Sequence, residues 1–489
     1  MGIKTLLKIF LACIIIAETA LCQSGVILTI PSTTANEGFK ISDDYTGLSF
    51  GAITELPNHA GVTGHLWSAN NKEVVNLFKN CGIHNLRLGG STVEGLNAAV
   101  PTRTDIDSVF AFAKAAGVKV IYTLRLLNGE AGVAASTAKY IWNNYRDYLD
   151  YFAIGNEPDI KDFLYPPNGK GTDPRIKDYA SYHRIWKKFR AAVLDSVPEA
   201  QFVGPDAAGR KWAVEFADDE KNSKEVSLIT QHWYIGGTPH INGLSPRTKP
   251  TPPYIPVDSA VNSMLSKIWI DKKCAEFYKQ TIDPIMKDGF AYRMTESDDY
   301  LRGVPNASNA FASALWGLDY LHWFAEHDCS GVNFHNTTWL MTDTIYRDST
   351  GSFEINPRAY ALKAFDIGGH GRVKKVIIKN PDSINLTAYA VQNEKDLFVT
   401  IINKEHDDGS REAKVEIDAV NISKKASIIF LTAPDNNVLA KTGITIGGST
   451  LTNHSQWQGS WASLVPGNNG RLSVIVPQSS AAIVRITLK

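Results

Sequence analysis

The chain has 489 residues, of which 44% are hydrophobic and 10% aromatic, enough for one large domain with a substantial core and a smaller second domain. Lys and Arg total 50, and Asp and Glu also total 50, so the net charge is zero. This balance gives no reason to expect a nucleic acid or an anionic membrane as the partner.

The N-terminus has the pattern of a targeting segment. Lys4 and Lys8 precede an apolar run over residues 9–17, and Ala20 lies near a cleavage point. The run is too short to span a membrane. We therefore expect residues 1–22 to be a signal peptide cleaved near Cys22, and an exported protein, periplasmic or extracellular. Leu21 argues against a lipid anchor at Cys22, because a lipoprotein signal normally carries a small residue there.

From residue 45 to 367, short apolar runs alternate with segments of helical periodicity. Eight such runs are typical of strands in a buried parallel sheet: 46–50, 84–88, 118–124, 151–155, 201–204, 226–232, 291–295 and 331–334. The predicted helices are 71–80, 105–116, 136–148, 179–196, 260–287 and 307–327. This alternation predicts an α/β fold, a (β/α)8 TIM barrel over residues 45–367.

Beyond residue 368 the pattern changes to short β-branched runs separated by turns. They are 373–379, 384–391, 396–403, 413–417, 426–431, 471–476 and 481–488. They predict a C-terminal antiparallel β-sandwich domain over 368–489. The early run 25–30 is expected to add a strand to this sandwich, from the N-terminal segment 24–44.

Two further segments carry weaker signals. The stretch 234–257 is rich in Gly and Pro, and we interpret it as a substrate-lining loop over the barrel mouth, with an irregular surface insertion as the alternative. Cys81, Cys274 and Cys329 are far apart and odd in number, so buried free thiols are expected. No spacing of Cys and His suggests a metal site.

Two glutamates end predicted strands. Glu157 follows the run Phe152 to Asn156, and Glu296 follows Met294-Thr295. The ends of the fourth and seventh strands of an eight-stranded barrel face each other across the mouth, where catalytic groups converge. Two carboxylates held there are the equipment for hydrolysing a glycosidic bond. We predict Glu157 as the acid/base and Glu296 as the nucleophile.

Four neighbours fit supporting roles in sugar chemistry. Asn156 is expected to donate to the sugar 2-OH, Arg87 to lie beneath the nucleophile, and Tyr234 to hydrogen-bond to it, with His232 on the same side of the strand. Each has a plainer interpretation: Asn-Glu-Pro also ends strands, Arg87 suits a structural ion pair, and His232 suits a core. Their shared position at the same strand ends favours catalysis.

The chain resembles glycoside hydrolase family 79, which holds β-glucuronidases and heparanase-like enzymes, within a clan of (β/α)8 glycosidases with two catalytic glutamates. The resemblance lies in the motifs at residues 86–92, 154–158, 231–234, 295–297, 303–320 and 332–335. It implies a retaining mechanism with Glu157 as acid/base and Glu296 as nucleophile, without a metal or an organic cofactor.

The resemblance also implies where a uronate carboxylate would bind. The family uses a glycine-rich loop after the nucleophile and a tyrosine near the eighth strand. Here the loop ends at Arg302-Gly303 and contains Asp298 and Asp299, while Trp339 follows His335 near the eighth strand. Arg302 is the candidate to bind a carboxylate, and the two aspartates would oppose one.

The sequence therefore predicts an exo-acting retaining β-glycosidase, a β-glucuronidase by preference, whose partner is a carbohydrate. A neutral β-glycoside is the main alternative substrate. A second alternative is endo-cleavage of an acidic polysaccharide, which the zero net charge disfavours. The oligomeric state stays open.

Overall fold

The computed structural model describes residues 25–31, 37–95, 99–160, 173–237, 255–419, 422–467 and 470–488. The predicted signal peptide, residues 1–22, and most of the predicted loop 234–257 lie outside these residues. The part of the chain that is described contains no helix both long and apolar enough to cross a bilayer.

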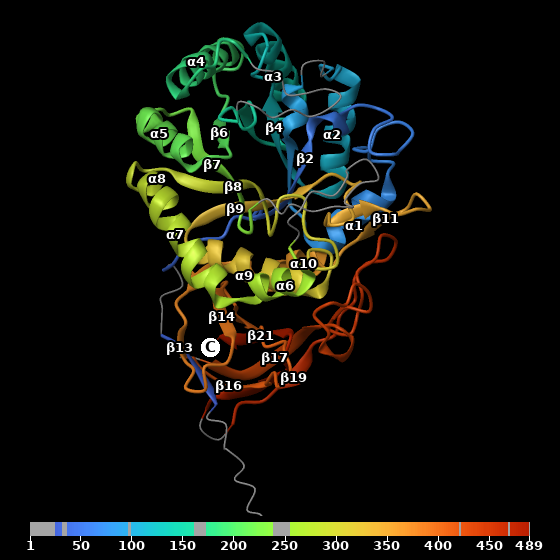
Figure 1. Ribbon diagram of the computed structural model, residues 1–489, viewed down its shortest axis with the longest axis vertical. Coiled ribbons are helices and arrows are strands. Elements are labelled where there is room, and N and C mark those ends of the chain that lie inside the picture. Colours follow the sequence, from blue (N-terminus) through green and yellow to red (C-terminus); the bar gives the residue numbers. More distant parts are fainter. Residues whose placement is uncertain are drawn as a thin grey trace, which may run out of the picture.

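Eight parallel strands close into a barrel, which confirms the predicted fold class (Figure 1). The chain places each strand beside the next, and β9 closes the barrel against β2. The strands are β2 (Thr46–Gly51), β3 (Asn85–Gly89), β4 (Lys119–Leu124), β5 (Leu149–Ile154), β6 (Phe202–Ala207), β7 (Val226–Tyr234), β8 (Ala291–Asp298) and β9 (Cys329–Asn336).

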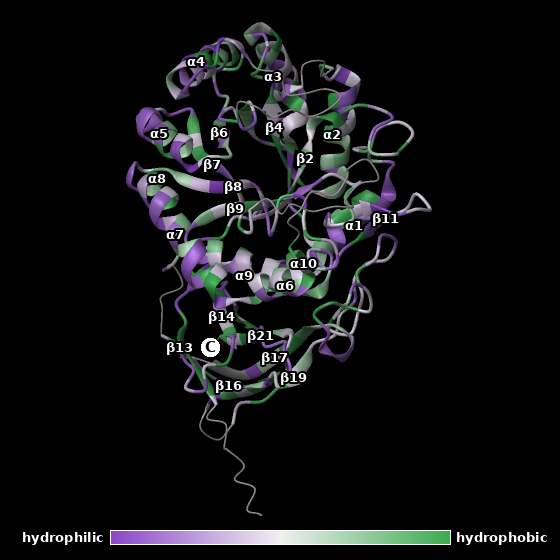
Figure 2. Ribbon diagram, viewed as in Figure 1, coloured by the Kyte–Doolittle hydropathy of each residue, from purple (hydrophilic) through white to green (hydrophobic). Residues whose placement is uncertain are grey.

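Helices surround the barrel, and 3-10 turns η1 (Ala52–Glu55) and η2 (Ser91–Glu94) follow β2 and β3. Hydrophilic residues lie along the outer helices α5, α7 and α8 (Figure 2). The helices are α1 (Lys72–Cys81), α2 (Arg103–Ala116), α3 (Ala131–Tyr145), α4 (Tyr179–Ser196), α5 (Arg210–Glu220), α6 (Val257–Leu265), α7 (Ala275–Phe277), α8 (Asp283–Lys287), α9 (Phe311–Glu326) and α10 (Arg358–Gly368).

The helix prediction over 260–287 is wrong as a single element. The chain leaves the helix at Ser266, which is extended, and continues as π-helical and α-helical turns from Trp269 to Lys287. The Ser266 hydroxyl accepts from the backbone N–H of Ile268, a local bond that competes with helix continuation. The helix α5 had no counterpart in the prediction.

The C-terminal region forms two sheets, as predicted. One has the order β13-β1-β16-β20, and the other β12-β14-β15-β21-β17-β18 with β19 also on β17. The N-terminal strand β1 lies in the first, parallel to β16 and antiparallel to β13. The strands are β1 (Val26–Ile30), β12 (Arg372–Lys374), β13 (Ile377–Lys379), β14 (Leu386–Gln392), β15 (Asp396–Asn403), β16 (Ala413–Ala419), β17 (Ile422–Thr432), β18 (Thr445–Ile446), β19 (Ala462–Leu464), β20 (Leu472–Val476) and β21 (Ser480–Leu488).

The helix α9 lies between the barrel and the sandwich (Figure 1). All its residues except Glu326 are buried, including Asp319. The Asp319 carboxylate accepts from the hydroxyls of Thr387 and Tyr389, each at 2.7 Å, and from the ammonium of Lys404 at 2.5 Å. These three partners come from the sandwich, so a buried ion pair joins the two regions.

Cys81, Cys274 and Cys329 are buried free thiols. Burial raises the pKa of the Cys81 thiol to about 12, so this sulfur stays protonated at neutral pH.

Candidate active site

A cavity of about 430 Å³ opens at the carboxyl ends of the barrel strands. Its volume lies within the range of about 300–1,000 Å³ that is typical of small-molecule sites. The lining comes from the ends of β2, β3, β5, β7, β8 and β9, and includes Glu157, His232, Tyr234, Glu296, Arg302, His335 and Trp339. The strand ends thus bring most of the predicted site residues into one space.

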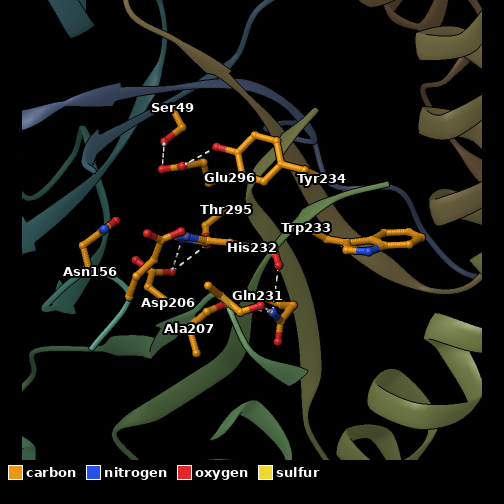
Figure 3. Close-up of polar contacts among 12 residues, drawn as sticks. Ser49, Asn156, Asp206, Ala207, Gln231, His232, Trp233, Tyr234, Thr295 and Glu296 are labelled. Atoms are coloured by element: carbon orange, nitrogen blue, oxygen red, sulfur yellow. Dashed lines mark hydrogen bonds and ion pairs between the residues drawn. The ribbon is translucent and has the colours of Figure 1, made fainter. Parts of the chain in front are cut away.

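Both carboxylate oxygens of Glu296 are held by donors, as predicted for the nucleophile. Tyr234 donates its phenolic hydrogen to Oε1 at 2.6 Å (Figure 3). Arg87 Nη1 donates to Oε2 at 2.9 Å. Burial alone would raise the pKa of Glu296, but the charges of His232, His335 and Arg87 and the Tyr234 hydrogen bond lower it to about 2. Glu296 is therefore ionised at neutral pH.

A turn of unusual backbone conformation presents Glu157. Gly155 has φ +85°, and a Cβ there would come 2.9 Å from the side chain of Leu126. Glu157 itself has φ +45°, a conformation that costs a non-glycine residue free energy and that is concentrated at functional sites. Its backbone N–H donates to the Asp206 carbonyl at 2.8 Å, which holds the turn against β6.

The two glutamates lie close together across the mouth. A carboxylate oxygen of Glu157 and one of Glu296 lie within 4.8 Å of each other. Carboxyl groups of retaining glycosidases are about 5–5.5 Å apart, whereas those of inverting enzymes are about 6.5–9.5 Å apart to admit a water. The observed spacing fits the first class.

The imidazole ring of His232 lies between the carboxyl groups of Glu157 and Asp206. Its Nδ1 lies 3.0 Å from Glu157 Oε1, and its Nε2 lies 3.7 Å from Asp206 Oδ1. Burial alone would lower the pKa of His232, but the charge of Glu296, the nearby carboxylate of Asp206 and the hydrogen bond with Glu157 raise it to about 9. At neutral pH the ring is an imidazolium, so Nδ1 donates to Glu157.

Asp206 is a site residue that the sequence interpretation missed. It is buried at the end of β6 and accepts from Arg87 Nη2 at 2.8 Å and from the Thr295 hydroxyl at 2.6 Å. Burial would raise the pKa of its carboxyl, but Arg87, His232 and Thr295 hold that pKa well below its usual range. The predicted strand ended at Gly204, three residues too early, although an Asp after Gly-Pro at a strand end was a signal.

Some of the predicted substrate-binding residues line the cavity, and others lie behind its wall. Arg302, His335 and Trp339 line the cavity, and Trp339 is 53% exposed. Asn156 is buried beside it, and its Oδ1 accepts from Arg87 Nη2 at 2.7 Å. Gly303 supports the wall, since its φ is +70° and a Cβ would lie 2.5 Å from the side chain of Thr342.

The expectation that Asp298 and Asp299 oppose a substrate carboxylate is wrong. The strand β8 continues to Asp298, and both side chains are buried against Arg358 of α10. Arg358 Nη1 donates to Asp298 at 2.8 Å, and Nη2 lies 3.1 Å from Asp299. Burial raises the pKa of the Asp298 carboxyl well above its usual range, and both side chains contact Arg358 rather than the cavity.

Two groups of side chains in the described part of the chain have metal-ligand spacing. In the first, Glu157, His232 and Glu296, the Arg87 guanidinium already occupies Glu296 Oε2 at 2.9 Å. In the second, His84, Asp366 and His370, the Lys363 ammonium occupies Asp366 Oδ2 at 2.9 Å. Neither arrangement suits a cation.

Residues 388–483 match the glycosyl hydrolase family 79 C-terminal beta domain. This match lies within the C-terminal region of the chain. A β-glucuronidase of Aspergillus niger is 26% identical to the chain over 220 residues, which span 40% of the chain and 37% of that protein.

Solved structures with similar folds include two other glycosidases. One is a 4-O-α-L-rhamnosyl-β-D-glucuronidase from Fusarium oxysporum 12S, with a TM-score of 0.65, 16% identity and coverage of 94% of this chain and 99% of that one. The other is an α-L-arabinofuranosidase from Thermotoga maritima, with a TM-score of 0.63, 16% identity, and coverage of 95% and 100%. At this identity the likeness between these structures and the chain shows the fold alone.

Proposed function

We propose that the chain is a glycoside hydrolase, an exo-acting retaining β-glucuronidase. The observation that carries this proposal is the pair Glu157 and Glu296, whose carboxylate oxygens approach within 4.8 Å at the mouth of the barrel. The A. niger relative, named a β-glucuronidase, and the family 79 domain support the choice of sugar.

The first step of the proposed reaction breaks the glycosidic bond. Glu157, protonated, donates its proton to the departing oxygen, and the ionised Glu296 attacks the anomeric carbon to form a covalent glycosyl ester. Arg87 and Tyr234 hold the attacking carboxylate in place, since each oxygen has its own donor.

In the second step Glu157, now ionised, takes a proton from a water molecule. The water attacks the anomeric carbon and releases Glu296, so the two inversions leave the β configuration retained. His232 Nδ1 lies 3.0 Å from Glu157 Oε1 and holds this side chain in place through both steps.

A uronate carboxylate needs a cation in the cavity. Arg302 and His335 line it, while Asp298 and Asp299 are buried elsewhere, so the acidic residues after the nucleophile do not oppose a uronate. This arrangement supports a glucuronide over a neutral glycoside.

The test is hydrolysis of 4-nitrophenyl β-D-glucuronide beside the matching β-glucoside, β-xyloside and β-galactoside. We expect preferential turnover of the glucuronide, abolished in Glu296→Gln. Preferential turnover of a neutral sugar would overturn the glucuronide assignment and retain the catalytic pair. Release of shorter polymers from an acidic polysaccharide, without monosaccharide, would overturn exo action.

A further inference from the structure

A second cavity, of about 460 Å³, adjoins the catalytic one. It lies over the carboxyl ends of β2, β3 and β4, between the turns η1 and η2 and the start of α3. Ile53, Ser91 and Thr92 line both cavities. A molecule held in the catalytic cavity can therefore extend into the second without leaving the protein surface.

The wall of the second cavity gathers apolar side chains that water would otherwise contact. Ile53, Val100 and Val133 are 37%, 54% and 46% exposed, which is unusual for large aliphatic residues. Leu56, Pro101 and Leu124 add to the same wall. An apolar surface of this kind, rimmed by polar residues, is typical of a ligand-binding groove.

One buried polar group lies in this apolar wall. Glu55 is 2% exposed, and its Oε2 has no hydrogen-bond partner among the described residues. Burial, only partly offset by a hydrogen bond with Tyr122, raises the pKa of Glu55 to about 8, so the carboxyl is uncharged at neutral pH. An uncharged carboxyl both donates and accepts, which suits a hydroxyl group.

We propose that the second cavity binds an apolar, hydroxyl-bearing ring of the substrate, joined to the sugar that the catalytic cavity holds. The aliphatic wall takes the faces of the ring, and Glu55 bonds its hydroxyl. This ring is either the aglycone or a substituent on the sugar. The inference rests on the proposed glycosidase function only in joining the ring to a sugar. Recognition of the ring itself depends on the second cavity alone.

Binding of the free ring tests the cavity without catalysis. Equilibrium dialysis of the full chain with 2,6-dihydroxynaphthalene should show saturable binding, weakened about tenfold or more in Val133→Asp, which puts a charge into the apolar wall. The matched control is Ser136→Asp, an exposed position on the same helix α3 outside the cavity. Equal binding by all three proteins, or no binding, would overturn the proposal.

Kinetics tests the link to the sugar and separates the two sources of the ring. Methyl β-D-glucuronide is compared with the 6-hydroxy-2-naphthyl β-D-glucuronide and with methyl β-D-glucuronide carrying a 4-O-(4-hydroxybenzyl) group. We expect kcat/KM about tenfold or more above the methyl compound for one ring-bearing substrate, and Val133→Asp should remove that advantage. A naphthyl advantage that Val133→Asp removes identifies the aglycone, because the better leaving group alone would keep its advantage in this variant. A benzyl advantage that Val133→Asp removes identifies a sugar substituent.

The hydroxyl contact has its own control. Glu55→Leu should make 2-naphthyl and 6-hydroxy-2-naphthyl glucuronides, or the 4-O-benzyl and 4-O-(4-hydroxybenzyl) pair, equally good substrates, with methyl glucuronide turnover reporting an intact fold. Hydrolysis of all glucuronides without any advantage for a ring overturns this inference and leaves the proposed function intact. Binding of the free ring without any hydrolysis overturns the proposed function instead.

Discussion

The phenolic oxygen of Tyr234 lies 2.6 Å from Oε1 of Glu296, on the carboxylate oxygen that Arg87 does not bind. A hydrogen bond to a charged group contributes about 1.5–3 kcal/mol. Tyr234→Phe is therefore expected to lower kcat about 10- to 100-fold. Because the bond lowers the pKa of Glu296, its loss should also move the acidic limb of the pH–rate profile upward. An unchanged limb would contradict the assigned contact.

The two glutamates predict different behaviour with external nucleophiles. Glu157→Ala should lose about 10²- to 10⁴-fold in kcat/KM on substrates with poor leaving groups, the usual contribution of a general acid. Azide should restore turnover of 4-nitrophenyl β-D-glucuronide and give the β-glucuronosyl azide, identified by NMR. Glu296→Gln should lose at least about a thousandfold in kcat without such rescue. An α-azide product from Glu157→Ala would exclude the assigned roles.

His232 predicts a dependence of stability on alkaline pH. Its pKa in the folded protein, about 9, exceeds the ordinary value of 6.5. The stabilisation is therefore fully present below pH 6.5, falls as the pH rises, and is lost once the pH has passed about 9. The loss is on the order of 3 kcal/mol. Chemical unfolding of wild type and His232→Gln between pH 6 and 10 measures it, since the difference between the two should shrink over this window.

Arg358 predicts a structural role for the acidic residues after the nucleophile. Removing it leaves Asp298 and Asp299 buried without a cation, which typically costs about 3–5 kcal/mol. Arg358→Met should therefore lower the free energy of unfolding by this amount, measured by urea denaturation. The variant Asp298→Asn retains one anion beside Arg358, and should be less damaging. Equal stability of Arg358→Met and wild type would mean that the cluster is not ionised as described.

The sequence predicted which side chains meet at the mouth of the barrel wherever a side chain lies at the end of one strand. Glu157, Glu296, Arg87 and Tyr234 each follow or end a short apolar run, and a barrel brings such ends together whatever their separation in the chain. The orientation of Asp298 was not predictable in this way. It depends on the continuation of β8 beyond Glu296 to Asp298, and on a contact with Arg358, which lies 60 residues later in the chain. The expectation that Asp298 lies in a loop and opposes a substrate carboxylate was therefore wrong.

Local bonds explain the remaining differences. The end of the predicted helix at Ser266 depends on one hydroxyl contact, which a periodicity pattern does not register. Asp206 was missed because its strand carries a Gly-Pro pair, a combination that usually ends a strand.

The ion pair between Asp319 and Lys404 indicates that the barrel and the sandwich do not fold as separate units. Cutting the chain after the barrel would expose the apolar face of α9 to water and leave Asp319 without its cation and its two hydroxyl donors. The sandwich is therefore not an appended sugar-binding module that a shorter enzyme would lack. One face of the sandwich packs into the same hydrophobic core as the barrel helices. The smallest unit expected to fold therefore contains the barrel and the sandwich.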